Sequence, residues 1–97
     1  MTWRFRQIKN GLRLHEEGQA LAHCVATYQA RCAAGESAIW SLIGKRPDGA
    51  QAGRVTIEVR HGGTIWECRG YGNRFASNEE ALIIRRWAEE FGLFWPR

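Results

Sequence analysis

Two glutamates in the second half of the chain are the residues best placed for chemistry. Residues 54–60 alternate strictly between polar and apolar side chains, and the glycine pair at 62–63 leads into residues 64–69. This pattern predicts an antiparallel β-hairpin with a two-residue loop at the glycines. In that register Glu58 lies directly opposite Glu67. Both carboxylates would then share one face of the sheet.

Facing carboxylates repel each other, so a nearby cation is expected, and three arginines lie within diagonal reach: Arg54, Arg60 and Arg69. One interpretation is a polar site in which Glu58, Glu67 and His23 supply acid–base chemistry to a hydrolase or nuclease. Arg69 would clamp an anion there. The other interpretation, which the residues alone favour, is a solvated sheet face with a cross-strand charge network. A slip of one residue in register would remove the pairing.

The same register sorts the hairpin into an apolar and a polar face. Five residues are expected to point toward the core: Val55, Ile57, Val59, Trp66 and Cys68. The opposite face would carry Arg54, Thr56, Glu58, Glu67 and Arg69, joined by Ser41 from a neighbouring strand.

The first third of the chain predicts a strand and a helix. Residues 3–8 favour a short strand that closes in a turn at Asn10–Gly11. Residues 14–34 contain no proline and many alanines, and Gly35 follows where a C-cap belongs, so one long helix is predicted. Its apolar stripe would consist of Leu21, Cys24, Val25, Tyr28 and Cys32.

The remaining segments complete an α+β domain. Residues 37–44 are rich in β-formers and precede a turn at 45–49, while Ser77 and Glu80 form a capping box for a helix that ends at Gly92. The order is β-α-β-β-β-α, an antiparallel β-meander of three to four strands packed with two α-helices. Helices on one side would leave the polar sheet face open.

His23 and Cys24 lie next to each other in the predicted long helix. Neighbouring helical residues point about 100° apart, which argues against a Cys–His dyad. Paired zinc-ligand motifs are absent, so no metal and no cofactor is predicted. A buried free cysteine and a hydrogen-bonded histidine are the better interpretation.

Composition limits the class of protein. Ninety-seven residues predict a single domain over residues 1–97, and 44% hydrophobic residues exclude a disordered chain. The net charge is +4, and twelve of the fourteen basic residues are arginines, which favour bidentate recognition of phosphate or carboxylate. Three cysteines and no long apolar run predict a cytoplasmic protein without a membrane segment.

A basic, aromatic segment follows the hairpin. Residues 69–75 contain Arg69, Tyr71, Asn73, Arg74 and Phe75. Tyr71 and Phe75 could stack on unpaired bases, or they could belong to the rim of the core. Asn73 follows two glycines in a turn, where its amide can bond to local backbone.

Several short motifs, spread over roughly residues 12 to 90, resemble those of one protein family. They are Leu14-His15-Glu16-Glu17-Gly18, His23-Cys24-Val25 with Tyr28, Ser41-Leu42, Thr56-Ile57-Glu58, and Cys68-Arg69-Gly70 with Asn73-Arg74. Together they resemble the PcfJ-like family, which takes its name from a protein of conjugative plasmids and occurs in bacteria, plasmids and phages. Family members commonly carry glutamine where this chain has Glu67. The resemblance implies a mobile-element setting and no particular reaction.

These observations favour a binding module over an enzyme. The expected partner is nucleic acid or a host or phage protein, bound through an arginine-rich, aromatic surface. The candidate binding residues are Arg69, Tyr71, Asn73, Arg74, Glu58, Glu67 and His23. The alternatives are the hydrolase or nuclease above and an inhibitor of a host or phage protein machine. The sequence assigns no catalytic residue and no oligomeric state.

Overall fold

The computed structural model describes residues 1–22 and 31–96, which form a four-stranded antiparallel sheet with helices. Along the chain the elements are β1 (Thr2–Ile8), α1 (Gly11–Leu21), β2 (Ser37–Lys45), β3 (Gln51–Arg60), β4 (Thr64–Arg69), the 3₁₀ turn η1 (Tyr71–Asn73) and α3 (Asn78–Glu90). The strands lie in the order β1-β2-β3-β4. The predicted α+β class and the antiparallel meander are therefore confirmed.

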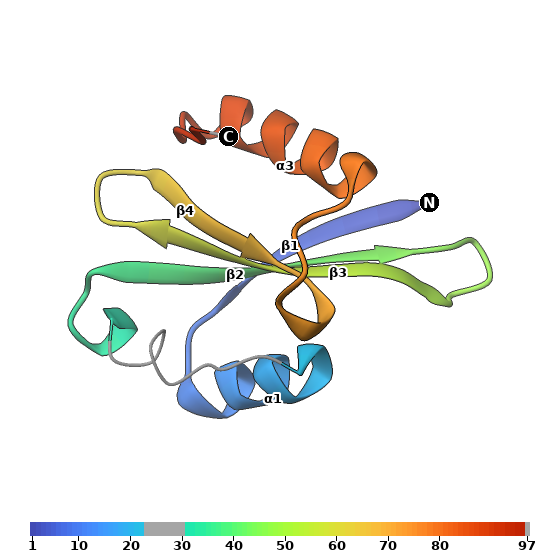
Figure 1. Cartoon of the computed structure of the whole chain (residues 1–97), viewed down its shortest axis with the longest axis horizontal. Coiled ribbons are helices and arrows are strands. Elements are labelled where there is room, and N and C mark those ends of the chain that lie inside the picture. The colour runs from blue at the N-terminus through green and yellow to red at the C-terminus, as the bar shows by residue number, and fades with distance from the viewer. Residues whose placement is uncertain (23–30, 97) are drawn as a thin grey trace.

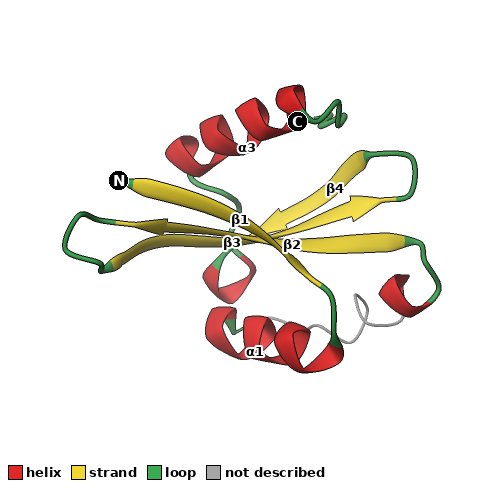
Figure 2. Cartoon of the chain, turned by 180° about the vertical axis from the view of Figure 1, so that it is seen from behind, coloured by secondary structure: helices red, strands yellow, loops and turns green. Residues whose placement is uncertain are grey.

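Helices cover both faces of the sheet. Figure 1 shows α3 on one side and α1 on the other, and the view from behind in Figure 2 gives the same order of layers. The prediction of an open polar face is wrong. The chain passes from β1 directly into α1 on one face, and from β4 through η1, which lies against α1, before it reaches α3 on the other face. No helix among the described residues is both long and apolar enough to cross a membrane.

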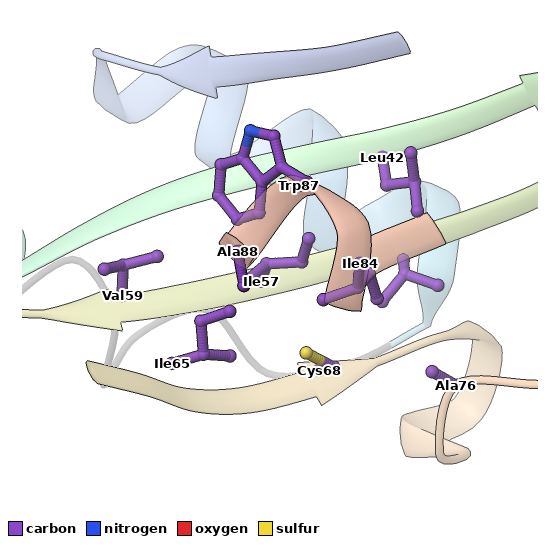
Figure 3. Close-up of a cluster of buried hydrophobic side chains, with 10 residues drawn as sticks. Leu42, Ile57, Val59, Ile65, Cys68, Ala76, Ile84, Trp87 and Ala88 are labelled. Carbon is purple, nitrogen blue, oxygen red and sulfur yellow. The ribbon is translucent and has the colours of Figure 1, made fainter. Parts of the chain in front are cut away.

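The main hydrophobic core lies between α3 and the sheet (Figure 3). Ile57 from β3 and Ile84 from α3 are fully buried in it, and Cys68 and Trp87 are nearly so. Phe5 of β1 stacks on Trp87 with ring centroids 4.5 Å apart. Alternate residues of each strand point to one face, so the apolar positions of all four strands meet the apolar stripe of α3.

The capping box predicted for α3 is confirmed. The Ser77 hydroxyl accepts a hydrogen bond from the Glu80 backbone N–H at 3.1 Å, and the Glu80 carboxylate accepts one from the Ser77 N–H at 2.8 Å. These bonds satisfy backbone donors that the first turn of a helix leaves unpaired. The helix ends at Glu90, and Gly92 follows in a left-handed conformation.

The first helix is shorter than predicted. Asn10 is the N-cap of α1 instead of a turn residue, because its side chain accepts a bond from the Arg13 N–H at 2.9 Å. The helix ends at Leu21, and Ala22 adopts a left-handed conformation with φ 52°. A single helix over 14–34 is therefore wrong. Within its expected stripe, Leu21 is buried, while Cys24, Val25 and Tyr28 lie outside the described residues.

The β3–β4 hairpin keeps the predicted register only in the half that lies away from its loop. Glu58 faces Glu67 and Ile57 faces Cys68 as predicted, but a bulge near Glu58 shifts the remaining pairs. The extra residue is Trp66, which is 57% exposed instead of pointing to the core, whereas Ile65 is buried. The loop contains three residues instead of the predicted two. The one extra residue in β4 then brings the pairs beyond the bulge back to the predicted register.

Two glycines face each other across β2 and β3 so that a tryptophan can lie over them. Gly44 pairs with Gly53, and a Cβ on Gly44 would stand 2.5 Å from the Trp3 ring. A Cβ on Gly53 would stand 3.2 Å from the same ring. Because neither glycine has a side chain, the Trp3 ring can pack closely against the backbone of β2 and β3.

Candidate functional site

The polar face of the sheet, beneath α1, contains two buried carboxylates. The side chains of Glu17 and Glu58 are 1% and 0% exposed. A buried carboxylate is costly unless cations and hydrogen-bond donors surround it. Each of these two has such a set of partners, drawn from separate elements.

Glu17 fastens α1 to the middle of the sheet. One of its oxygens accepts a bond from the Ser41 hydroxyl at 3.1 Å and two from the Arg54 guanidinium, while the other accepts a bond from Thr56 at 2.7 Å. Sequence reasoning missed this residue as a site member. The available signal was its position in α1, where it shares one helix face with the buried residues Leu14 and Leu21.

Glu58 is held by the segment that leads into β2. Arg31 donates to both of its oxygens, at 2.6 and 3.0 Å, and the Ser37 hydroxyl donates at 2.7 Å. The Nε of Arg60 lies 3.5 Å away, buried and without a hydrogen bond of its own among the described residues. Glu58 therefore already has its donors, and solvent does not reach it.

The facing glutamates are neutralised separately. Glu58 takes Arg31 and Arg60, whereas Glu67 lies 3.8 Å from Arg69 and is partly exposed. Arg69, one of the three arginines expected near the pair, lies beside Glu67, and the arginines beside Glu58 are Arg31 and Arg60. Of the three arginines expected near the pair, Arg54 binds Glu17 instead.

Cys32 lies beside the Arg31–Glu58 pair. Burial raises the pKa of its thiol, the negative charge of Glu58 raises it further, and Arg31 opposes them. The thiol is therefore protonated at neutral pH, which makes it a poor nucleophile. Cys32 and Cys68 are both free, and Cys68 is buried as predicted. Cys24 and His23 lie outside the described residues.

Arg74, a predicted binding residue, has a structural partner. Its guanidinium donates to both oxygens of Glu80, at 2.8 and 3.1 Å, and thereby ties η1 to the first turn of α3. Burial by itself raises the pKa of Glu80, but the bonds from Arg74 and Ser77 outweigh it and hold the pKa below 4.5. The same bond raises the pKa of Arg74.

Arginine and aromatic side chains gather along β4, the edge strand. Arg60 lies 3.9 Å from the ring centre of Trp66, Arg69 lies 4.3 Å from that of Phe75, and Arg85 lies 5.2 Å from that of Trp95. A shallow hollow of about 320 Å³ runs along the strand, with all three aromatic residues in its lining. We call Trp66, Arg69, Phe75 and Trp95, with Arg60, the β4-edge surface.

The remaining predicted residues lie beside this surface in η1. Tyr71 is 66% exposed, and Asn73 is exposed with φ 65°. Asparagine tolerates this left-handed conformation better than most residues. Of the seven predicted binding residues, Arg69 lies in the β4-edge surface and Tyr71 and Asn73 adjoin it. Glu58 and Arg74 are engaged in internal contacts.

A family model described as PcfJ-like protein matches residues 5–84. The chain belongs to this family. The matched region contains every described residue of both buried carboxylate clusters and most of the β4-edge surface. No curated protein and no solved structure matched this PcfJ-like chain.

The buried carboxylates and the β4-edge surface of this PcfJ-like chain are suited to different chemistry. The Glu58 carboxylate is not accessible for proton transfer, since it is fully buried and accepts hydrogen bonds from Arg31 and Ser37. Within residues 1–22 and 31–96, no three side chains suited to bind a metal come together. The β4-edge surface, in contrast, has exposed aromatic rings at Trp66 and Phe75 and partly exposed arginines beside them.

Proposed function

We propose that this PcfJ-like chain is a binding module of a plasmid, phage or prophage that contacts single-stranded nucleic acid through the β4-edge surface. The observation that carries the proposal is the row of aromatic rings, each with an arginine over one face, along a single hollow. The plasmid-associated family supports the mobile-element setting. The net charge of +4 is suited to a polyanion.

Stacking and charge would act together on such a ligand. Phe75 is 69% exposed and Trp66 is more than half exposed, so each ring has surface to offer beyond the part that its arginine covers. Stacking of a base on an aromatic side chain contributes about 1–3 kcal/mol. Arg69 stands beside Phe75, where its guanidinium can pair with the phosphate of a stacked nucleotide.

The enzyme alternative receives no comparable support. A hydrolase using Glu58 and Glu67 needs both carboxylates in one accessible cleft, and Glu58 is fully buried with Arg31 and Ser37 bonded to it. A protein partner, including one that the chain would inhibit, remains the main competitor for the same surface. Arginine and tryptophan are also enriched in protein interfaces.

The test is fluorescence anisotropy with a labelled oligodeoxythymidine. Phe75→Ala and Trp66→Ala should each weaken binding by about 1–3 kcal/mol. Phe91→Ala is the matched control, because Phe91 is a similarly exposed aromatic residue on α3 outside the hollow along β4. Equal affinities for all three variants would contradict the proposal.

A pull-down from a bacterial lysate, with and without nuclease, separates the two partner classes. Loss of the captured material after nuclease treatment supports a nucleic-acid partner. A protein that stays bound after nuclease treatment, and that Phe75→Ala releases, would assign the β4-edge surface to a protein instead.

A further inference from the structure

The outer edge of β1 is an unpaired strand edge at the far side of the sheet from β4. Among the described residues β1 pairs only with β2, through all seven of its positions. An unpaired edge presents a row of backbone N–H and C=O groups that can bind another strand. The β4 edge differs, because isolated bridges to Phe94 and Phe75 occupy both of its ends.

Cations line one side of the β1 edge. Arg4 and Arg6 alternate along the strand and, with Lys45 of β2, surround a hollow of about 250 Å³ on the face that α1 occupies elsewhere. All three side chains are exposed. None of them has a carboxylate within ion-pair distance in residues 1–22 and 31–96.

Aromatic residues line the other side of the same edge. Trp3 and Phe5, which alternate with the arginines, form the β1 wall of a hollow of about 560 Å³ that α3 closes with Trp87 and Phe91. Trp3 and Phe5 are only partly buried, and Phe91 is 62% exposed. The edge therefore separates a cationic hollow from a largely apolar one, whose lining also includes Arg86 and Glu90.

We propose that the β1 edge binds an extended segment of a partner protein, as an added β-strand whose side chains alternate between acidic and apolar. Successive side chains of a strand point to opposite faces of a sheet. A strand paired with β1 would place one set of side chains beside Arg4, Arg6 and Lys45 and the other set beside Trp3, Phe5 and Phe91. Acidic and apolar residues are the sets that match these surroundings.

A peptide strand fits this edge better than a nucleic acid does. The row of backbone groups along β1 needs donors and acceptors at strand spacing, which a peptide supplies and a sugar–phosphate chain does not. This inference concerns the opposite edge from the β4-edge surface, so either proposal can fail without the other.

The first probe is a synthetic heptapeptide that alternates glutamate with valine or phenylalanine. Its control has the same composition, with the glutamates in one block. The full chain should bind the alternating peptide at least about tenfold more tightly, because charge complementarity and alternation act together only in that peptide. On binding, backbone amides of residues 2–8 should gain protection from hydrogen exchange. Equal affinity for both peptides, or binding without such protection, would overturn the proposal.

The second experiment exchanges the charges. Arg4→Glu with Arg6→Glu changes the net charge from +4 to 0, since each substitution removes two units. Arg13→Glu with Arg46→Glu gives the same net charge from exposed arginines that do not line the cationic hollow, and it is the matched control. The edge variant should lose about tenfold in affinity for the glutamate peptide while the control loses much less.

A peptide with lysine in place of glutamate completes the cycle. It should bind the Arg4→Glu, Arg6→Glu variant more tightly than it binds the unchanged chain. Failure of this exchange in a variant with an unaltered melting temperature would overturn the proposal. Displacement of the glutamate peptide by oligodeoxythymidine, with the Arg4 and Arg6 substitutions weakening both ligands equally, would assign the edge to polyanions in general.

Discussion

The two faces of the sheet are stabilised by different interactions. Beneath α3, Ile57 and Ile84 are fully buried in an apolar core, where stability follows the area and volume buried. On the opposite, polar face, Glu17 and Glu58 are equally buried, but their stability depends on complete sets of hydrogen-bond donors. On the apolar face, the free energy of unfolding should therefore fall in proportion to the volume removed. On the polar face, it should fall sharply when a single hydrogen-bonding partner is removed.

The largest expected effect is on the polar face. Arg54→Met leaves the buried Glu17 carboxylate without its cation, so the free energy of unfolding in urea should fall by about 3–5 kcal/mol. Arg46→Met, at an exposed turn where Asp48 lies 3.9 Å away, should change it by less than about 0.5 kcal/mol. The double variant Arg54→Met, Glu17→Gln removes the stranded charge and should regain a large part of the loss. Equal loss in the single and double variants would show that packing, not charge, holds this face.

The apolar face should respond in a graded way. Ile84→Ala should lower the free energy of unfolding by about 2–4 kcal/mol, and Ile84→Val by about 0.5–1.5 kcal/mol. Arg54→Lys provides the contrast, because lysine keeps the charge but cannot reproduce the two bonds to Glu17. If Arg54→Lys proves harmless while Ile84→Val is severe, the two faces do not differ in the way described.

The difference between the faces also explains what could be predicted from sequence. Strict alternation predicted β3, the glycine pair predicted the hairpin into β4, and the capping box predicted the start of α3, because these signals are local. Burial of Glu17 depends on Arg54, which lies 37 positions away in the sequence. No local sequence pattern predicts a contact between residues so far apart.

Two local features were also beyond prediction. The bulge at Trp66 was invisible because two glycines fit a two-residue or a three-residue loop equally well. The end of α1 at Ala22 carries none of the usual stop residues, since alanine seldom adopts a left-handed conformation. The exposed Trp66 is part of the β4-edge surface, so the proposed site includes a residue that the predicted register had placed in the core.

A smaller, pH-dependent effect is expected where η1 meets α3. The folded pKa of Glu80 lies below its ordinary 4.5, so the ionised carboxylate stabilises the fold at pH values above 4.5. Glu80→Gln should therefore cost about 1–2 kcal/mol at pH 7, because Arg74 is partly exposed and solvent screens the pair. This difference from the unchanged protein should disappear as the pH falls through the depressed pKa. Glu79→Gln, in the same helical turn, is the control and should show little pH dependence.

The smallest effect on stability is expected for Arg69→Ala. Arg69 lies 3.8 Å from a partly exposed Glu67 and covers an exposed ring, and both interactions are weak at a surface. Glu58 keeps Arg31 and Arg60, so no buried charge is left unpaired. The free energy of unfolding should change by at most about 1 kcal/mol. Binding to oligodeoxythymidine should nevertheless weaken, with a smaller dependence on salt, because one phosphate contact is lost.

Adding Glu67→Gln to Arg69→Ala shows which of the two roles Arg69 has. If Arg69 contacts the ligand, the double variant keeps the stability of the single variant and still binds weakly. If Arg69 only compensates the facing glutamates, neutralising Glu67 should restore stability and binding together. That joint recovery would remove Arg69 from the β4-edge surface and leave stacking on Trp66 and Phe75 as its sole support.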